Sequence, residues 1–492
     1  MALLAAPILI TWVFAAVLAM LDGHKRVVGW FAVAGMTASF AATVALAVRV
    51  VRGGEIEMIS GGWPEGVGIA LRADALGVTF ALISGAVILI SLTYEVLGGV
   101  RSRTFPALVL FLNSGLMGIF LTGDIFNFYV FFEIAMTASY VLTGYRERDY
   151  QVRAAFIFAV VNLLGSVIFV IAVAGLYHLT GSLDMDVVAA RIGDAGIAPT
   201  IFIAAAIFVA FGLKLGLFPF HFWLPAVYVG SHAPVAAILS GALANIGSYG
   251  LLRFGGGILP EQLAEARVVL LVIGTLSIIY GALQAISRRS PVEVMAYSSI
   301  GQVGYILVAL GIGGPLGFAA ATLYAFVNSL NKLLLFLATG LRGPLVGAAF
   351  VIGAFSVAGV PPAVGFLGKL SLFQASIGLE SLWGSVVLVA LVFAGSVLSF
   401  LYSFQVYQRV YMRPGESPAR RPGEASPTIE RGGKPSPAVV RGLLIVVAGL
   451  VVALGLWPEP LLVLSQGAAE ALSAPSAPAA PSDPAASMGG GR

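Results

Sequence analysis

Long apolar runs, separated by short polar stretches, cover nearly the whole chain. A helix of about 20 apolar residues is long enough to cross the ~30 Å hydrocarbon core of a bilayer. Such runs lie at residues 3–21, 27–48, 69–97, 104–121, 124–145, 153–178, 199–224, 232–256, 265–287, 292–313, 316–340, 344–376, 383–411 and 439–461. The pattern therefore predicts an all-α polytopic membrane protein with about fourteen transmembrane helices.

The composition agrees with a membrane protein and excludes several kinds of site. Of the 492 residues, 59% are hydrophobic and 10% are charged, whereas soluble domains carry about 25% charged residues. The chain has no cysteine and four histidines, which excludes disulfides, iron–sulfur clusters and zinc–thiolate sites. We expect no cofactor and no bound metal. The net charge of +4 is spread over many loops, a pattern that does not indicate nucleic-acid binding.

Two polar stretches interrupt the apolar pattern near the C-terminal end. Residues 412–438 are rich in Pro, Gly, Ser and Arg, residues 462–492 are rich in Ala, Pro and Ser, and both are predicted to be disordered. The rest of the chain divides into an N-terminal three-helix segment (1–103), two five-helix units (104–256 and 265–411) and a last transmembrane helix (439–461).

Basic residues in the loops predict the orientation of the chain. Lys and Arg accumulate in cytoplasmic loops of membrane proteins. With the N-terminus outside, the inside loops contain 17 Lys or Arg residues and the outside loops contain 7. Both termini are therefore predicted to face the periplasm or cell exterior, with the protein in the inner (plasma) membrane. Three lysines fall inside apolar runs instead: Lys214, Lys332 and Lys369.

One carboxylate, Glu133, lies within the fifth apolar run. Asp124 stands where its side chain can cap the start of this helix. Nine residues at ~1.5 Å each place Glu133 roughly 13–14 Å along the helix, near the middle of the bilayer. A carboxylate there is costly unless it is paired, hydrated or protonated, so the position indicates an ion path. The alternative is a structural acid that a neighbouring helix satisfies.

The seventh run contains a lysine next to a predicted break. Lys214 lies in FVAFGLKLGLFPFHFWLP, where Pro219 should end the helix because it removes a backbone donor and clashes with the preceding turn. Non-helical backbone at membrane depth is tolerated inside protein or beside water. Lys214 is therefore a candidate ion-path residue, with snorkelling to the surface as the alternative. His221 is equally consistent with proton relay and with an interfacial position.

A second break is predicted in the twelfth run. Pro361 and Pro362 interrupt FSVAGVPPAVGFLGKLSLF, and Lys369 follows two turns later. When Lys214 is aligned with Ser356, Pro219 coincides with Pro361. Interrupted helices in corresponding places are typical of transporters built from inverted repeats. The sequence thus predicts two inverted five-helix repeats, spans 4–8 and 9–13, with broken helices at spans 7 and 12.

The tenth and eleventh runs carry further polar residues. Lys332 lies in AFVNSLNKLLLFLATG, one turn after Asn328 on the same helical face. A buried ammonium is far costlier than a hydroxyl, which favours a functional role for Lys332. For Ser298 and Ser299, hydrogen bonding between helices is the favoured interpretation. Ser298 is nevertheless kept as a candidate on a proton path with His221, Asn245 and Asn328.

Four segments resemble the antiporter-like subunit family: GDIFNFYVFFE, FGLKLGLFPFHFWLP, MAYSSIGQVGY and AGVPPAVGFLGKLSLF. This family includes proton-pumping membrane subunits of respiratory complex I, related hydrogenase subunits and the large subunits of Mrp-type cation/proton antiporters. The first and last segments are most similar to the D subunits of Mrp antiporters. The resemblance implies that Glu133 and Lys214 form an acid–lysine pair, that Lys332 and Lys369 continue a polar axis, and that other membrane subunits are partners.

The chain departs from the family pattern in three places. Asn245 stands on the eighth span, where the family usually has a lysine, and Asn328 stands where a histidine is frequent. The basic run before AYSS is replaced by residues 290–293. Because Asn cannot carry a proton, although it can hold a water, Asn245 calls into question a continuous proton wire between the two halves.

Three functions remain open from the sequence. The first is a proton-translocating subunit of a multisubunit monovalent cation/proton antiporter, with sodium as a candidate cation. The second is a pumping subunit of complex I or of a membrane-bound hydrogenase, in which case the chain is part of an NADH:quinone oxidoreductase or related enzyme. The third is a structural membrane subunit without transport, an alternative supported by Asn245 and Asn328.

Overall fold

The computed structural model describes residues 2–62, 68–379, 381–412 and 438–473. Its long helices are α1 (Ala2–Ala19), α2 (Arg26–Gly53), α3 (Ala75–Gly98), α4 (Phe105–Phe120), α5 (Ile125–Thr143), α6 (Asp149–Thr180), α8 (Ile197–Leu215), α13 (Arg267–Ser287), α14 (Pro291–Ile312), α15 (Gly314–Thr339), α16 (Pro344–Ala358), α17 (Gly365–Ile377), α18 (Leu382–Tyr407), α19 (Ala438–Leu456) and α20 (Glu459–Ser473). The shorter α-helices are α7 (Met185–Arg191), α9 (Leu224–Gly230), α10 (Ala233–Ile238), α11 (Asn245–Gly250) and α12 (Pro260–Glu265). The remaining elements are strands β1 (Ile56–Ile59) and β2 (Ala70–Ala73) and the short helices η1 (Ser60–Gly62), η2 (Ile192–Ala195), η3 (Phe220–Trp223), η4 (Leu239–Leu243), η5 (Leu251–Ile258) and η6 (Gln408–Met412).

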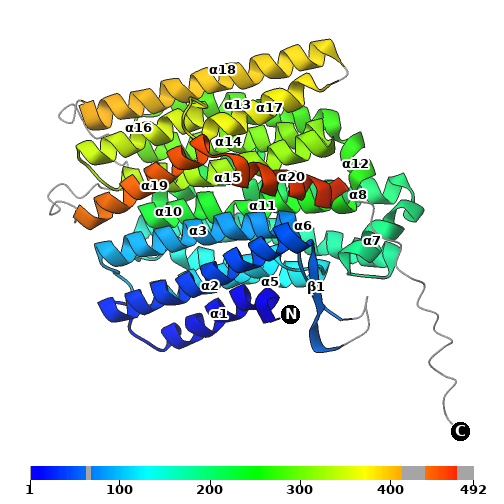
Figure 1. Cartoon of the computed structure of the whole chain (residues 1–492), viewed down its shortest axis with the longest axis horizontal. Helices are drawn as coiled ribbons and strands as arrows, with labels where there is room; N and C mark the ends of the chain where they lie inside the picture. Colours follow the sequence, from blue (N-terminus) through cyan, green and yellow to red (C-terminus); the bar gives the residue numbers. More distant parts are fainter. Residues whose placement is uncertain (1, 63–67, 380, 413–437, 474–492) are drawn as a thin grey trace, which may run out of the picture.

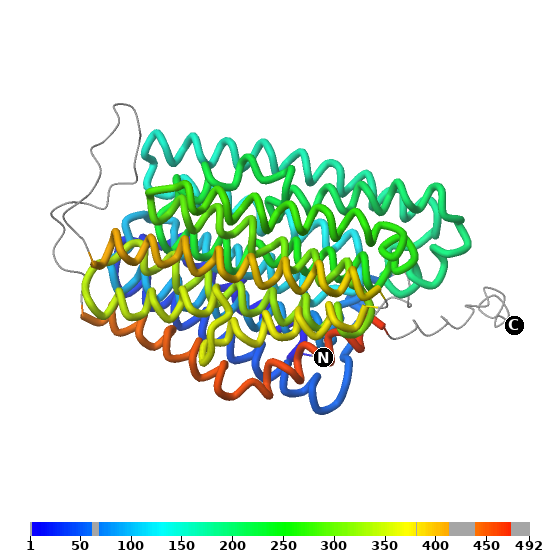
Figure 2. The backbone as a smooth tube through the Cα atoms, turned by 90° about the horizontal axis from the view of Figure 1, so that it is seen from above, coloured from blue at the N-terminus to red at the C-terminus, as the bar shows by residue number. Residues whose placement is uncertain are grey.

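The all-α membrane fold is confirmed. Within the described residues, 12 helical segments are long and apolar enough to cross a membrane, and α4 and α16 are shorter apolar helices. Each of the fourteen predicted apolar runs contains a helix, although the number of spans stays a prediction. Figure 1 shows the long helices running side by side, with α1 and α2 at one edge and α18 at the other. Seen from above in Figure 2, α6 and the α19–α20 pair lie on opposite sides.

A β-hairpin precedes α3 and was not expected. β1 and β2 pair antiparallel, with Ile56 opposite Ala73, so the third apolar run begins with a strand rather than with a helix. The hairpin also binds the α4–α5 connection, because Gly123 N donates to Ala70 O at 2.9 Å. Helix α3 starts at Ala75, where the Asp74 side chain accepts from Gly77 N at 2.8 Å. The hairpin lies at the same end of the molecule as α7 and α12 (Figure 1).

The prediction of disorder for 462–492 is wrong for its first part. Residues 459–473 form α20, which packs against α3 and α15. Leu461, Ala468, Ala469 and Leu472 are buried, so an Ala- and Leu-rich helix covers an apolar surface of the bundle. Most of the other predicted loop, 412–438, lies outside the described residues, as does the tail after Ser473.

The two predicted helix breaks occur, and they share one backbone pattern. Gly216 caps the C-terminus of α8 and Gly359 caps that of α16, both with left-handed backbone, at φ 66° and 83°. Gly216 N donates to Leu213 O and Gly359 N donates to Ser356 O, at 3.2 and 3.0 Å. This match pairs Pro219 with Pro362, one residue later than the sequence alignment proposed.

Candidate functional site

Glu133 lies on α5 at partial exposure, with α6 as its neighbour. The predicted cap is present, since Asp124 Oδ1 accepts from Asn127 N at 2.6 Å. The Ser166 hydroxyl of α6 donates to Glu133 Oε1. The carboxylate therefore has a polar partner on the next helix.

Lys214 is buried in the last turn of α8, with 4% of its surface exposed. Its Nζ donates to Asn162 Oδ1 at 3.4 Å and lies 4.9 Å from the centre of the Phe132 ring. Burial excludes the snorkelling alternative. Among the ion pairs of the described residues, none joins Glu133 to Lys214 within 4.0 Å.

Asn162 and Ser166 of α6 stand between this acid and this lysine. Asn162 contacts Lys214, and Ser166, one turn later, contacts Glu133. Neither residue is among the sequence-based candidates. A signal was present, because these two polar side chains, four residues apart, share one face of the apolar middle of α6.

Lys332 is fully buried on α15. Its Nζ donates to Ser298 Oγ at 2.9 Å and to Met295 O at 3.4 Å, both on α14. Ser298 Oγ lies 2.9 Å from the Tyr402 hydroxyl of α18. Ser298 is therefore more than a link between two helices, because it is a direct partner of a buried ammonium.

The polar network continues from Tyr402 toward the second break. Gln302 Nε2 donates to the Tyr402 hydroxyl at 3.2 Å, and the Tyr324 hydroxyl donates to Gln302 Oε1 at 2.5 Å. Lys369 Nζ lies 3.3 Å from the Tyr305 ring centre and 5.5 Å from the Tyr324 ring centre. Within the described part of the chain, this ammonium has no hydrogen-bond acceptor, and ring faces are its neighbours. Hydrogen bonds thus run from Lys332 as far as Tyr324, and the ring of Tyr324 lies 5.5 Å from Lys369 Nζ.

Asn245, at the start of α11, makes hydrogen bonds to α3 and α15, and within the described residues none of its hydrogen bonds goes to a lysine. Its amide donates to Ser84 Oγ of α3 at 3.0 Å and to Gly241 O at 3.1 Å. Its Oδ1 accepts from Ser329 Oγ of α15 at 3.1 Å, and Ser329 is one turn from Lys332. Asn245 therefore joins α3 to the lysine-bearing helix of the second half.

Two candidates stay outside these networks. Asn328 is buried, and its Oδ1 has no hydrogen-bond partner among the residues described. His221 lies in η3 at partial exposure, with its ring 4.3 Å from the Tyr280 ring. No hydrogen bond in the described structure links His221 to Lys214, so both interpretations of this histidine remain predictions.

A buried ion pair at the hairpin end was also not predicted. Arg253 donates to Asp74 Oδ2 at 2.6 Å and to the Tyr249 hydroxyl at 3.1 Å. Arg72 lies 2.6 Å from Asp186 Oδ1 and 2.6 Å from Glu55 Oε1. Burial raises the pKa of Asp74, but Arg253 and then Arg72 outweigh it, so this pKa lies below its ordinary value.

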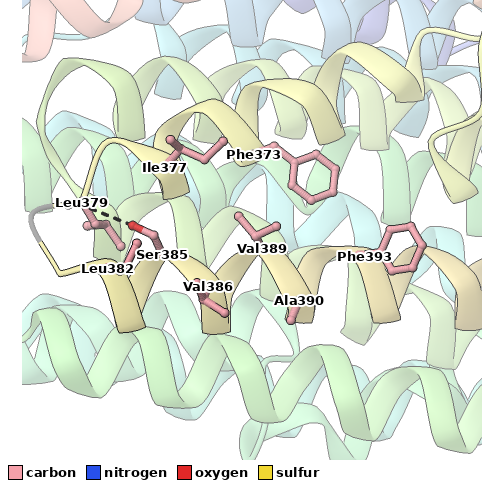
Figure 3. Close-up of a pocket in the computed structure, with 9 residues that line it drawn as sticks. All are labelled: Phe373, Ile377, Leu379, Leu382, Ser385, Val386, Val389, Ala390 and Phe393. Carbon is pink, nitrogen blue, oxygen red and sulfur yellow. Dashed lines mark hydrogen bonds between the residues drawn. The ribbon is translucent and has the colours of Figure 1, made fainter.

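An open cavity among the described residues is not an ion site. It lies between α17 and α18, has a volume of about 660 Å³, and is lined by apolar side chains with Ser385 as the polar exception (Figure 3). No charged side chain lines it. The buried lysines lie in the interior of the bundle instead.

Comparisons with known proteins identify similar membrane subunits. Residues 122–398 match the family model described as NADH:quinone oxidoreductase/Mrp antiporter, TM. The D subunit of the Na(+)/H(+) antiporter of Alkalihalophilus pseudofirmus is 32% identical over 395 residues, which cover 75% of this chain and 80% of the relative.

Solved structures extend the similarity over the whole chain. A chain of the Mrp complex from Dietzia sp. DQ12-45-1b has a TM-score of 0.84 and 26% identity, and the match covers 96% of this chain and 97% of that one. A chain of the membrane-bound sulfane sulfur reductase, an archaeal respiratory membrane complex, also has a TM-score of 0.84 and 26% identity, covering 96% and 98%.

Proposed function

Because the chain belongs to the NADH:quinone oxidoreductase/Mrp antiporter family of membrane subunits, we propose that it is an ion-translocating subunit of a multisubunit monovalent cation/proton antiporter. It carries protons, with sodium as the candidate exchanged cation, and works with other membrane subunits. The observation that carries the proposal is the set of three buried ammonium groups, Lys214, Lys332 and Lys369, which contact neutral polar or aromatic partners.

The arrangement of these lysines favours proton transfer over a structural role. A structural buried ammonium is normally paired with a carboxylate, because desolvation is otherwise uncompensated. Lys332 instead contacts a hydroxyl and a carbonyl, and Lys369 contacts aromatic rings. Such a group gains and loses a proton easily, since neither state is fixed by a counter-ion.

In the first half, the proposed steps use Glu133, Ser166, Asn162 and Lys214. A cation or proton that arrives near Glu133 weakens the attraction between this carboxylate and the Lys214 ammonium. Lys214 then gives a proton from Nζ to water in the path, while its hydrogen bond to Asn162 Oδ1 orients the amine. When the arriving ion leaves, the Glu133 charge favours reprotonation of Lys214.

In the second half, the proposed path runs from Lys332 through Ser298, Tyr402, Gln302 and Tyr324 to Lys369. Hydroxyl groups can donate and accept, so they support transfer along a chain. The amide of Gln302 cannot carry a proton itself, and water must pass the proton around it. Between the two halves, the amide of Asn245 cannot carry a proton either, so water must also pass the proton there.

The alternative is a pumping subunit of a respiratory complex or of a membrane-bound hydrogenase. The match to the archaeal respiratory complex supports it as strongly in TM-score as the match to the Mrp complex supports the antiporter. The 32% identity to the D subunit of an antiporter favours the first proposal. The predicted orientation, with both termini outside, is the same for the antiporter and for the respiratory subunit, so it does not discriminate between them.

The test measures cation-driven proton flux in inverted membrane vesicles that contain the complete complex. Glu133→Ala should abolish flux while the complex still assembles, and Glu133→Asp should keep part of it. Thr137→Ala is the matched control, because Thr137 lies one turn later on α5 and is exposed. Flux of the Glu133→Ala complex equal to that of the parent would contradict the assignment. Proton pumping that requires an electron donor and not a cation would support the respiratory alternative.

A further inference from the structure

A second buried carboxylate, Glu95, lies at the arginine-rich end of α3, opposite the hairpin. Glu95 is 3% exposed. The Tyr145 hydroxyl donates to Glu95 Oε1, and Arg146 lies 3.7 Å from the same oxygen. The other carboxylate oxygen, Oε2, lies 3.4 Å from His232 Nδ1, and this nitrogen has no hydrogen-bond partner among the described residues. This group is separate from the lysine networks described above.

His232 connects Glu95 to the surface. Its side chain is 26% exposed, whereas that of Glu95 is 4% exposed. His232 Nε2 lies 2.7 Å from an Arg146 guanidinium nitrogen. A guanidinium donates and never accepts, so Nε2 is the acceptor and the proton of the neutral imidazole is on Nδ1, toward Glu95.

The surrounding charges keep His232 neutral. Burial, and then the charges of Arg146, Arg101 and Arg148, hold the pKa of His232 well below its usual range. The groups that face Glu95 and His232 are Tyr94 on α3, Arg101 in the α3–α4 connection, and Tyr145, Arg146 and Arg148 in the α5–α6 connection.

From Glu95, polar side chains lead along α3 to the centre of the molecule. Ser91 is one turn away on the same face, is buried, and has a hydroxyl without a partner among the described residues. Ser84 follows on that face and accepts the hydrogen bond from Asn245. The face from Glu95 to Ser84 spans eleven residues, roughly 16 Å. It ends at the link between Asn245 and Ser329, one turn from Lys332.

We propose that Glu95 is a proton-loading site for the central path, that His232 relays protons to it from the arginine-rich side, and that Arg146 closes this relay. The inference rests on the proposed transport function. In the relay, Nε2 of His232 takes a proton from a hydronium ion, which is left as water. Nδ1 closes its 3.4 Å gap to Glu95 Oε2 and gives its proton to that oxygen, so His232 stays neutral and its tautomer changes. The step requires Arg146 to leave Nε2. The loaded proton then moves along the Ser91–Ser84 face through water to the Asn245 junction.

Three variants of the complete complex test the relay by flux in vesicles, with the pH varied on the arginine-rich side alone. Glu95→Gln and His232→Gln keep size and hydrogen bonding but cannot pass protons. Each should lower flux by roughly hundredfold or more and flatten its dependence on the pH of that side. Arg146→Gln should raise flux at high pH, because no guanidinium then occupies Nε2 of His232 and this nitrogen is free to take up protons.

The matched control is an exposed Asp–His pair at the same end of the molecule. His24 Nδ1 lies 2.9 Å from Asp22 Oδ1 with both side chains about half exposed, and Gly23 N donates to Arg103 O beside it. Asp22→Asn should leave flux and pH profile unchanged. A merely structural role for Glu95 predicts a lower melting temperature of the Glu95→Gln complex with an unshifted pH profile, and this result would overturn the proposal.

A spectroscopic measurement separates this inference from the transport function itself. Infrared difference spectra of the purified complex between two pH values should contain a carboxyl band that disappears in Glu95→Gln and shifts in His232→Gln. If the band is absent, Glu95 does not load protons and the proposal fails even when the parent transports. If the parent complex shows no flux but the band is present, the transport function fails and proton loading at Glu95 stands.

Discussion

At the residue scale, each buried lysine has a different contact partner, so a different neighbouring side chain stabilises each ammonium group. Lys214 has the amide of Asn162, Lys332 has the hydroxyl of Ser298, and Lys369 has the ring of Tyr305. Each partner is neutral. The charge of the ammonium is therefore stabilised by orientation of dipoles and of ring electrons, and it is sensitive to the loss of a single contact.

Asn162→Leu should disable the first half of the path. The substitution removes the acceptor of Lys214 Nζ and keeps a similar volume. We expect cation-driven proton flux to fall by at least roughly tenfold, the effect of about 1.4 kcal/mol on a rate. Ser166→Ala should reduce flux too, because Glu133 loses its donor. Flux in vesicles, normalised to the amount of assembled complex, measures both effects. Unchanged flux in the two variants would show that α6 only separates the acid from the lysine.

Asp74 offers a pH-dependent prediction on stability. Its pKa is lower in the folded protein than its ordinary 3.8, so its contribution to the stability is complete above that value and is lost as the pH falls through the folded pKa. Asp74→Asn leaves Arg253 buried without its carboxylate, which costs about 3–5 kcal/mol. Melting temperatures of the purified complex should differ most near pH 7, and the difference should shrink below pH 4. A constant difference would contradict this account.

At the scale of elements, the glycine caps fix the position of the second break. Gly359 has φ 83°, and a Cβ there would lie 2.6 Å from Lys369 Cγ. The cap therefore determines how closely α16 approaches Lys369. Gly181, at the end of α6, has φ 72° but open space around its Cα. Both glycines need a left-handed backbone, but an added methyl group would contact Lys369 at Gly359 and nothing at Gly181.

Gly359→Ala should consequently impair both stability and transport, whereas Gly181→Ala should impair stability alone. The left-handed backbone costs an alanine about 1 kcal/mol at each site. At Gly359 the methyl group also displaces Lys369 from the Tyr305 ring. Thermal unfolding and vesicle flux on both variants measure the two effects separately. Equal flux in both variants would mean that the position of Lys369 is not critical.

The long helices were predictable from the sequence, and the β-hairpin and α20 were not. An apolar run of about 20 residues has few alternatives to a membrane helix, so each predicted run contains one. The β1–β2 hairpin was missed because each strand has four residues and its stability comes from pairing with distant backbone. α20 was missed because its Ala-rich composition resembles that of the tail that follows, and the apolar surface that it covers is not visible in the sequence.

A truncation tests the role of α20. A chain that ends after Ser473 should assemble like the full chain. A chain that ends after Pro458 should be less stable, because the surfaces of α3 and α15 under Leu461 and Leu472 become exposed. Melting temperature and yield of the complex measure this effect. Equal stability of the two truncated forms would show that a partner subunit covers this surface.

At the scale of the whole molecule, the charged residues of the site and Ser298 were predictable, and most of their neutral partners were not. A lysine or glutamate within an apolar run is conspicuous, and Glu133, Lys214, Lys332 and Lys369 are conspicuous for this reason. Tyr324 and Tyr402 were not predictable, because aromatic residues occur throughout membrane helices and only the packing of α14, α15 and α18 selects these two. From the sequence, Asn245 was expected to interrupt the proton path between the two halves. In the structure its side chain makes hydrogen bonds to both α3 and α15.

Whether the two halves act as one path follows from double substitutions of the lysines. Residues that act in one unit lose activity non-additively, so a second substitution adds little once the path is cut. Lys214→Met and Lys332→Met should each reduce flux strongly, and the double variant should be no slower than the slower single variant. Asn245→Leu should resemble them, because it removes the hydrogen bonds to Ser84 and Ser329 without changing any charge. If the fold-loss of flux in the double variant equals the product of the two single losses, each half carries ions independently. Normal flux in Lys332→Met would mean that the first half alone passes ions to a partner subunit.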